Sequence, residues 1–121
     1  MTQYAILLPG DEGAWERASD EERAAVYALH GDFARALAER GHRITGGAEL
    51  ELSHGAKTVR RGPTGEVLIT DGPYAEAAEQ LTGFYLVEFD DLDDLLQICG
   101  ILAHGENIEV RAVVEREGQE P

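Results

Sequence analysis

The chain has 121 residues, which is enough for one domain with a hydrophobic core that needs no disulfide or metal. Its 10 Lys and Arg residues against 24 Asp and Glu residues give a formal net charge of −14, which argues against direct binding to nucleic acid or to an anionic membrane. The single cysteine, Cys99, excludes an internal disulfide and fits a reducing compartment, so we expect a cytoplasmic protein.

The N-terminal part predicts a strand followed by a long helix. Residues 3–8 form an apolar run that is far too short to span a membrane and that we expect to end at Pro9 and Gly10. After a loop carrying Trp15, Ser19 and Glu22 match a capping box, which predicts a helix to about residue 40. By helical spacing His30 shares the apolar face of this helix, and its imidazole is therefore expected to point inward, beside Val26, Tyr27, Phe33, Ala34 and Leu37.

The middle of the chain predicts a strand and then a hairpin. Residues 43–52 favour a second strand that is entered through a bulge at Gly46 and Gly47. Residues 57–61 and 66–70 flank a Gly-Pro-Thr-Gly turn, which is typical of a β-hairpin. Residues 74–81 fit one or two helical turns and fit equally well a loop lying over the sheet.

The C-terminal part predicts a central strand, a second helix and a last strand. Residues 83–89 are apolar on both faces, so this strand needs cover on both sides. Asp90 or Asp91 is expected to cap a helix that ends at Gly105, and residues 108–114 alternate as a last strand. Residues 116–121 predict a frayed tail.

This order of elements predicts an α+β fold, a ferredoxin-like sandwich in which two helices cover one face of an antiparallel sheet, in a single domain over residues 1–121. The other face of the sheet would carry one apolar side of residues 84–89 and would be wet in a monomer. We therefore expect a homodimer in which two sheets pack face to face and form a barrel-like pair.

The turn Asp71-Gly72-Pro73-Tyr74 contains an unusual carboxylate. An Asp in a turn normally accepts a hydrogen bond from the backbone N–H two residues on, but here that residue is Pro73, which has none. The Asp71 carboxylate must find a partner elsewhere, such as the N–H of Tyr74, another side chain or a ligand.

This turn and the residues after it resemble the YCII-related DGPF-domain family, with Tyr74 in place of the usual Phe. Further matches include Ser19 to Arg23, His30 with Phe33, and Glu109-Val110-Arg111. The resemblance implies a dimeric α+β barrel built from ferredoxin-like units. It also implies a pocket that uses a His and Asp pair, and an association with extracytoplasmic-function sigma factors.

The strongest candidate for chemistry is therefore His30 with Asp71, in which Asp71 orients the imidazole and His30 shuttles a proton. The alternative is that His30 is a buried histidine bonded to the backbone and that Asp71 is only a turn residue. Tyr74, Tyr85 and Arg60 are candidates for substrate binding, since hydroxyls and a guanidinium could hold a small carbonyl or carboxylate ligand.

The sequence carries no motif for a metal or a cofactor. The four histidines do not share metal-ligand spacing, and phosphate-binding loops and nucleotide fingerprints are absent. Two functions stay open at this point. One is a cofactor-independent enzyme that acts on a small metabolite by acid–base chemistry, and the other is a non-catalytic dimeric module that binds a ligand or a protein in sigma-factor regulation.

Overall fold

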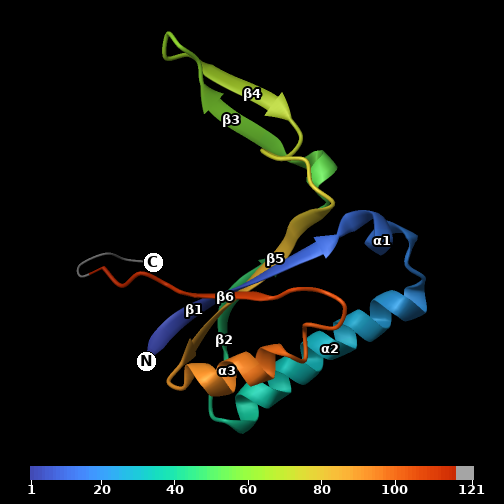
Figure 1. The fold of residues 1–121 in the computed structure, drawn as a ribbon, viewed down its shortest axis with the longest axis vertical. Coiled ribbons are helices and arrows are strands. Elements are labelled where there is room, and N and C mark those ends of the chain that lie inside the picture. The colour runs from blue at the N-terminus through green and yellow to red at the C-terminus, as the bar shows by residue number, and fades with distance from the viewer. Residues whose placement is uncertain (117–121) are drawn as a thin grey trace.

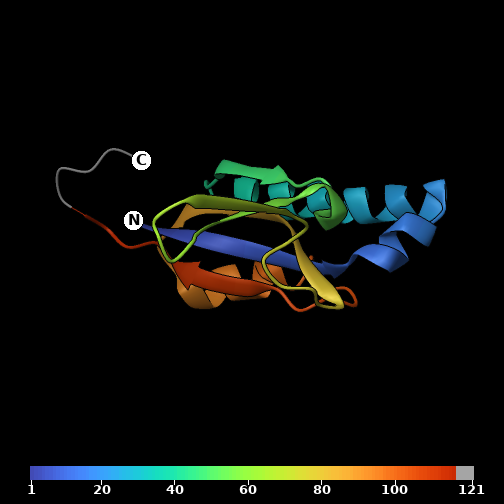
Figure 2. The ribbon, with the colours of Figure 1, turned by 90° about the horizontal axis from the view of Figure 1, so that it is seen from above.

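The computed structural model describes residues 1–116, and the predicted tail at 116–121 lies outside that range except for Arg116, which belongs to no helix or strand. Four strands form the main sheet in the order β2 (Ile44–Glu49), β5 (Glu79–Phe89), β1 (Thr2–Asp11) and β6 (Glu109–Ala112). All neighbouring pairs are antiparallel. Figure 2 shows the strands in this order, from green β2 to red β6. The predicted ferredoxin-like α+β fold is confirmed.

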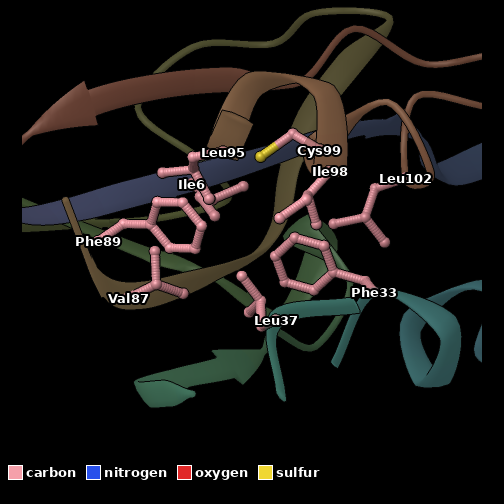
Figure 3. Packing of buried hydrophobic residues seen from close by; sticks show 9 residues of the cluster. All are labelled: Ile6, Phe33, Leu37, Val87, Phe89, Leu95, Ile98, Cys99 and Leu102. Atoms are coloured by element: carbon pink, nitrogen blue, oxygen red, sulfur yellow. The ribbon is translucent and has the colours of Figure 1, made fainter. Parts of the chain in front are cut away.

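Two helices cover one face of this sheet. Helix α2 (Asp20–Glu39) and helix α3 (Leu92–Cys99) lie side by side below the strands in Figure 1. Their apolar faces meet the sheet in one core, in which nine side chains point toward one another in Figure 3: Ile6, Phe33, Leu37, Val87, Phe89, Leu95, Ile98, Cys99 and Leu102. Burial raises the pKa of the Cys99 thiol to about 11, as expected for a thiol enclosed among apolar side chains. Among the helices of residues 1–116, none has the length and apolar character to cross a membrane.

The predicted capping box at the start of α2 is confirmed. The Ser19 hydroxyl accepts a hydrogen bond from the Glu22 N–H at 3.1 Å, and the Glu22 carboxylate accepts one from the Ser19 N–H at 2.9 Å. Two orphan N–H groups are thereby satisfied, which fixes where the helix begins.

Several predicted elements differ from the structure. Strand β1 does not end at Pro9 but continues to Asp11, because a shift in register after Leu8 lets Pro9 pair with β5. The Thr82 hydroxyl donates to the Leu8 carbonyl at 2.7 Å across this irregularity. The expected loop around Trp15 is instead a short helix, α1 (Glu12–Arg17), and α3 ends at Cys99 rather than at residue 105.

The predicted hairpin is confirmed, and it stands apart from the rest of the molecule in Figure 1. We use the name hairpin arm for β3 (Lys57–Arg61), β4 (Val67–Asp71) and the turn that joins them. These two strands form a sheet of their own, which the 3₁₀ turn η1 (Ser53–Gly55) precedes. Residues 74–78 form neither helix nor strand, so the loop alternative holds for them, and β5 already begins at Glu79.

Candidate functional site

A cleft of about 970 Å3 opens between the N-terminal half of α2, helix α1 and strands β2 and β5. We call it the His30 cleft; its walls include Trp15, Tyr27, His30, Glu49 and Tyr85. Its size lies in the range of small-molecule sites, and its walls mix aromatic side chains with a few polar groups.

His30 and Tyr85 form the polar centre of this cleft. The His30 Nδ1 and the Tyr85 hydroxyl oxygen are 2.7 Å apart, which is a short hydrogen bond between α2 and β5. The other ring nitrogen, Nε2, has no hydrogen-bond partner within residues 1–116, and no buried side-chain nitrogen or oxygen there lacks a partner, so Nε2 keeps solvent-accessible surface on a residue that lines the cleft. One side of the imidazole is thus held, while the other can meet a ligand.

Packing from the core holds the Tyr85 ring in position. The buried Phe33 ring stacks on it with 5.3 Å between centroids and an interplanar angle of 27°. Because Phe33 is fully enclosed, the hydroxyl that bonds to His30 projects from a rigid base.

The surroundings favour uncharged forms of both groups. Burial lowers the pKa of His30, and the Glu49 carboxylate opposes that shift without reversing it. Burial and then the Glu49 charge raise the pKa of Tyr85. At neutral pH the cleft therefore presents a neutral imidazole bonded to a protonated phenol.

Glu49 is the carboxylate that this chain places near His30. Both of its oxygens lie within hydrogen-bond distance of the Tyr27 hydroxyl, at 3.1 and 3.2 Å, so the bond joins α2 to β2 across the cleft. Strand β2 approaches β5 closely at Gly47, which has φ of +138° and where an added Cβ would come within 2.3 Å of the Phe84 carbonyl oxygen. Only glycine fits there, and the close approach sets where Glu49 projects.

Trp15 lines the cleft, and contacts to its helix, its backbone and its ring hold it in place. The Asp11 carboxylate caps α1 by accepting from the Ala14 N–H at 3.1 Å, and Arg23 of α2 donates to the Trp15 carbonyl at 2.8 and 3.2 Å. The indole meets the Tyr27 ring edge to face, with 5.6 Å between centroids.

The predicted partner of His30, Asp71, lies at the end of the hairpin arm. Its carboxylate, whose side chain is 82 % exposed, bonds to Lys57 directly across the hairpin. Asp71 lines a second cavity of about 470 Å3, together with Ser53 and His54, and not the His30 cleft. Within one chain the structure therefore brings together His30 and Tyr85 but not His30 and Asp71.

The other two predicted binding residues also lie outside the His30 cleft. Arg60 is exposed on β3, and the Tyr74 side chain, just after the hairpin arm, is 92 % exposed.

The sequence predictions missed Trp15 and Glu49. Trp15 was expected in a loop without periodicity, and Glu49 alternates with Ala48 and Leu50 as any solvent-facing strand residue does. Only the pairing of β2 with β5 shows that Glu49 lies on the same face of the sheet as Tyr85.

The comparison with known proteins agrees with this fold. The model of the YCII-related domain matches residues 2–115. The chain belongs to the YCII-related family. A relative in this family, an uncharacterised protein of Rhizobium meliloti (strain 1021), is 35 % identical over 101 residues, which cover 84 % of this chain and 80 % of that protein.

No group of three His, Cys, Asp or Glu side chains within residues 1–116 is arranged to hold a metal ion.

Proposed function

We propose that this YCII-related protein is a cofactor-independent enzyme that moves a proton on a small metabolite, with His30 as the general acid and base. The observation that carries the proposal is the His30–Tyr85 hydrogen bond in an open cleft, with Nε2 unbonded. A neutral imidazole with one free nitrogen is the group best suited to proton transfer near neutral pH.

The hydrogen bond to Tyr85 supports both the neutral imidazole of His30 and its imidazolium. When Nδ1–H donates to the Tyr85 oxygen, Nε2 carries a lone pair and accepts a proton from the substrate. The imidazolium that results is stabilised by the Tyr85 oxygen and by the Glu49 charge. Returning the proton from Nε2 to a different substrate atom completes an isomerisation or an elimination.

A second copy of the chain could supply the predicted site residues that lie outside the His30 cleft, which are Asp71, Tyr74 and Arg60. Alternation along β5 and β1 leaves Leu7, Phe84 and Leu86 on the face of the sheet that the helices do not cover. We propose that this face packs against its equivalent in a homodimer.

The hairpin arm supports contact between two copies. Three apolar side chains on one of its faces, Val59, Val67 and Ile69, are more than half exposed. The arm carries three basic residues and two acidic ones on a chain of net charge −14, so its contact with the body of another copy is electrostatically favourable. Such a contact would carry Asp71 toward a cleft of the partner, and the proposal places this homodimer in the cytoplasm.

The proposal is tested by following exchange of carbon-bound hydrogen in deuterated water, since proton abstraction can then be seen before any product is known. A panel of small aromatic and carbonyl metabolites is incubated with the protein and monitored by proton NMR. We expect one or more to lose a C–H signal, and we expect His30→Gln to abolish that loss while the variant stays folded by circular dichroism.

His54→Gln is the matched control, because His54 is exposed on η1 and lies outside the His30 cleft. Exchange that persists at the wild-type rate in His30→Gln would refute the enzyme. Binding without exchange in all variants would favour the non-catalytic binding module instead.

A further inference from the structure

The walls of the His30 cleft carry far more negative than positive charge. Seven Asp and Glu residues line the cleft, and Arg23 is the one Lys or Arg among its lining residues in the described chain. A ligand that enters therefore meets carboxylates far more often than cations.

Arg23 is already committed to the protein. Its Nε and Nη2 donate to the Trp15 carbonyl, and Nη2 also lies 3.3 Å from the Glu16 carbonyl oxygen. The guanidinium carbon lies 5.2 Å from the centroid of the Trp15 ring, in a cation–π contact. These hydrogen bonds use Nε and Nη2, so an anionic ligand would have only the Nη1 hydrogens of this arginine to bind without displacing a contact.

Glu49, by contrast, keeps acceptor capacity. It receives one hydrogen bond, from the Tyr27 hydroxyl, and a carboxylate can accept about four. The aromatic rings of Tyr27 and Tyr85 line the same cleft, and aromatic π faces attract cations.

A second point in the cleft shows the same crowding of negative charge. Partial burial, and then the charges of Glu79 and Asp11, raise the pKa of Glu106. Glu106 and Asp11 both line the cleft, so a bound cation would relieve their repulsion.

From these contacts we infer that the ligand of the His30 cleft is an organic cation, an amine with an aromatic or apolar body, whose ammonium group binds beside Glu49 within the wall of Trp15, Tyr27 and Tyr85. This inference deepens the proposed function and rests on the His30 cleft as the site. An ammonium near Glu49 would leave the neighbouring carbon atoms of the ligand facing His30.

The test uses three probes with the same phenylethyl body: phenethylamine, phenethyl alcohol and hydrocinnamate, which are cationic, neutral and anionic at neutral pH. Trp15 is the only tryptophan of the chain and lines the cleft, so its fluorescence reports binding at this site, with calorimetry as a second measurement. We expect the amine to bind about tenfold more tightly than hydrocinnamate, with the alcohol between them, as one exposed charge pair and one cation–π contact suggest.

Glu49→Gln should weaken the amine by roughly threefold and leave the alcohol unchanged. Glu39→Gln is the matched control, because it removes the same charge from the exposed C-terminal end of α2, outside the cleft. Equal losses in the two variants would mean that only net charge acts, and would overturn the inference.

Hydrocinnamate binding as tightly as the amine, or no binding of the amine at millimolar concentration, would overturn the inference as well. In the first of these cases the cleft still binds a ligand and the enzyme proposal stands. The enzyme proposal has a separate test, and it fails if His30→Gln retains proton exchange.

Discussion

The two halves of α2 carry one continuous apolar face but end in different surroundings. In the C-terminal half, Phe33 and Leu37 are completely buried between the sheet and α3. In the N-terminal half, Val26 is 39 % exposed and Tyr27 is 50 % exposed, and both line the His30 cleft. The same periodic pattern therefore builds the core at one end and a binding surface at the other, and His30 lies between them.

The largest expected effect comes from truncating the core half. Leu37→Ala should lower the free energy of unfolding by about 2–5 kcal/mol, because it leaves a cavity in a closely packed core. Val26→Ala, on the same face of the helix, should cost less than about 1 kcal/mol, since its side chain already meets solvent. Urea denaturation measures both; similar losses would mean that the two halves are equally packed.

The two faces of β5 give a second contrast, between adjacent residues. Val87→Asp should prevent folding, because it puts an unpaired charge among buried apolar side chains. Leu86→Asp, on the uncovered face, should leave the fold intact and break the proposed homodimer. Light scattering should then report one chain of 13.2 kDa instead of two, and an unchanged mass would rule out the face-to-face arrangement.

Tyr85→Phe tests what the hydrogen bond with Tyr85 contributes to His30. Loss of the phenol should slow proton exchange by about tenfold, which is the rate equivalent of one hydrogen bond. If Nδ1–H donates to the phenol oxygen, as proposed, the substitution should lower the pKa of His30 further, as NMR titration would show. A rise in that pKa would mean that the phenol donates to Nδ1 and that His30 presents an N–H to the cleft.

The smallest expected effect concerns pH. The pKa of His30 is lowered in the folded protein, so between that value and the ordinary value of about 6.5 the unfolded chain binds the proton that the folded chain does not. Stability should therefore fall as pH drops through this window. The melting temperature of His30→Gln should fall less than that of the wild type between about pH 7 and about pH 5. Equal falls in the two proteins would contradict the shifted pKa.

The fold was predictable because its signals are local. The Ser19 capping box, the Gly-Pro-Thr-Gly turn and the alternation in residues 108–114 each act over a few residues, and their order selects the topology. The boundary of β1 was not predictable, because a hydroxyl from Thr82, which is 74 residues away, supports the strand beyond Leu8.

The candidate site was predictable only in part. Helical spacing placed His30 on an inward face, and Tyr85 was among the residues expected to bind. Glu49 lies at the cleft because β2 pairs with β5, and Trp15 lies there because Arg23 of α2 donates a hydrogen bond to its carbonyl. Both are contacts between segments that are distant in the sequence. The partner expected for His30 was the carboxylate of Asp71, whereas within one chain the hydrogen-bond partner is the Tyr85 hydroxyl. The place of Asp71 beside His30 stays a prediction for the homodimer.

The burial of Cys99 makes this protein convenient for labelling experiments. Its thiol is enclosed in the core and stays protonated at neutral pH, so thiol-directed reagents should leave the folded wild-type chain unmodified. A cysteine introduced at the exposed position of Tyr74 would then be the one reactive thiol of each copy. In the proposed homodimer, a pair of spin labels at that position would measure directly how far apart the two hairpin arms lie.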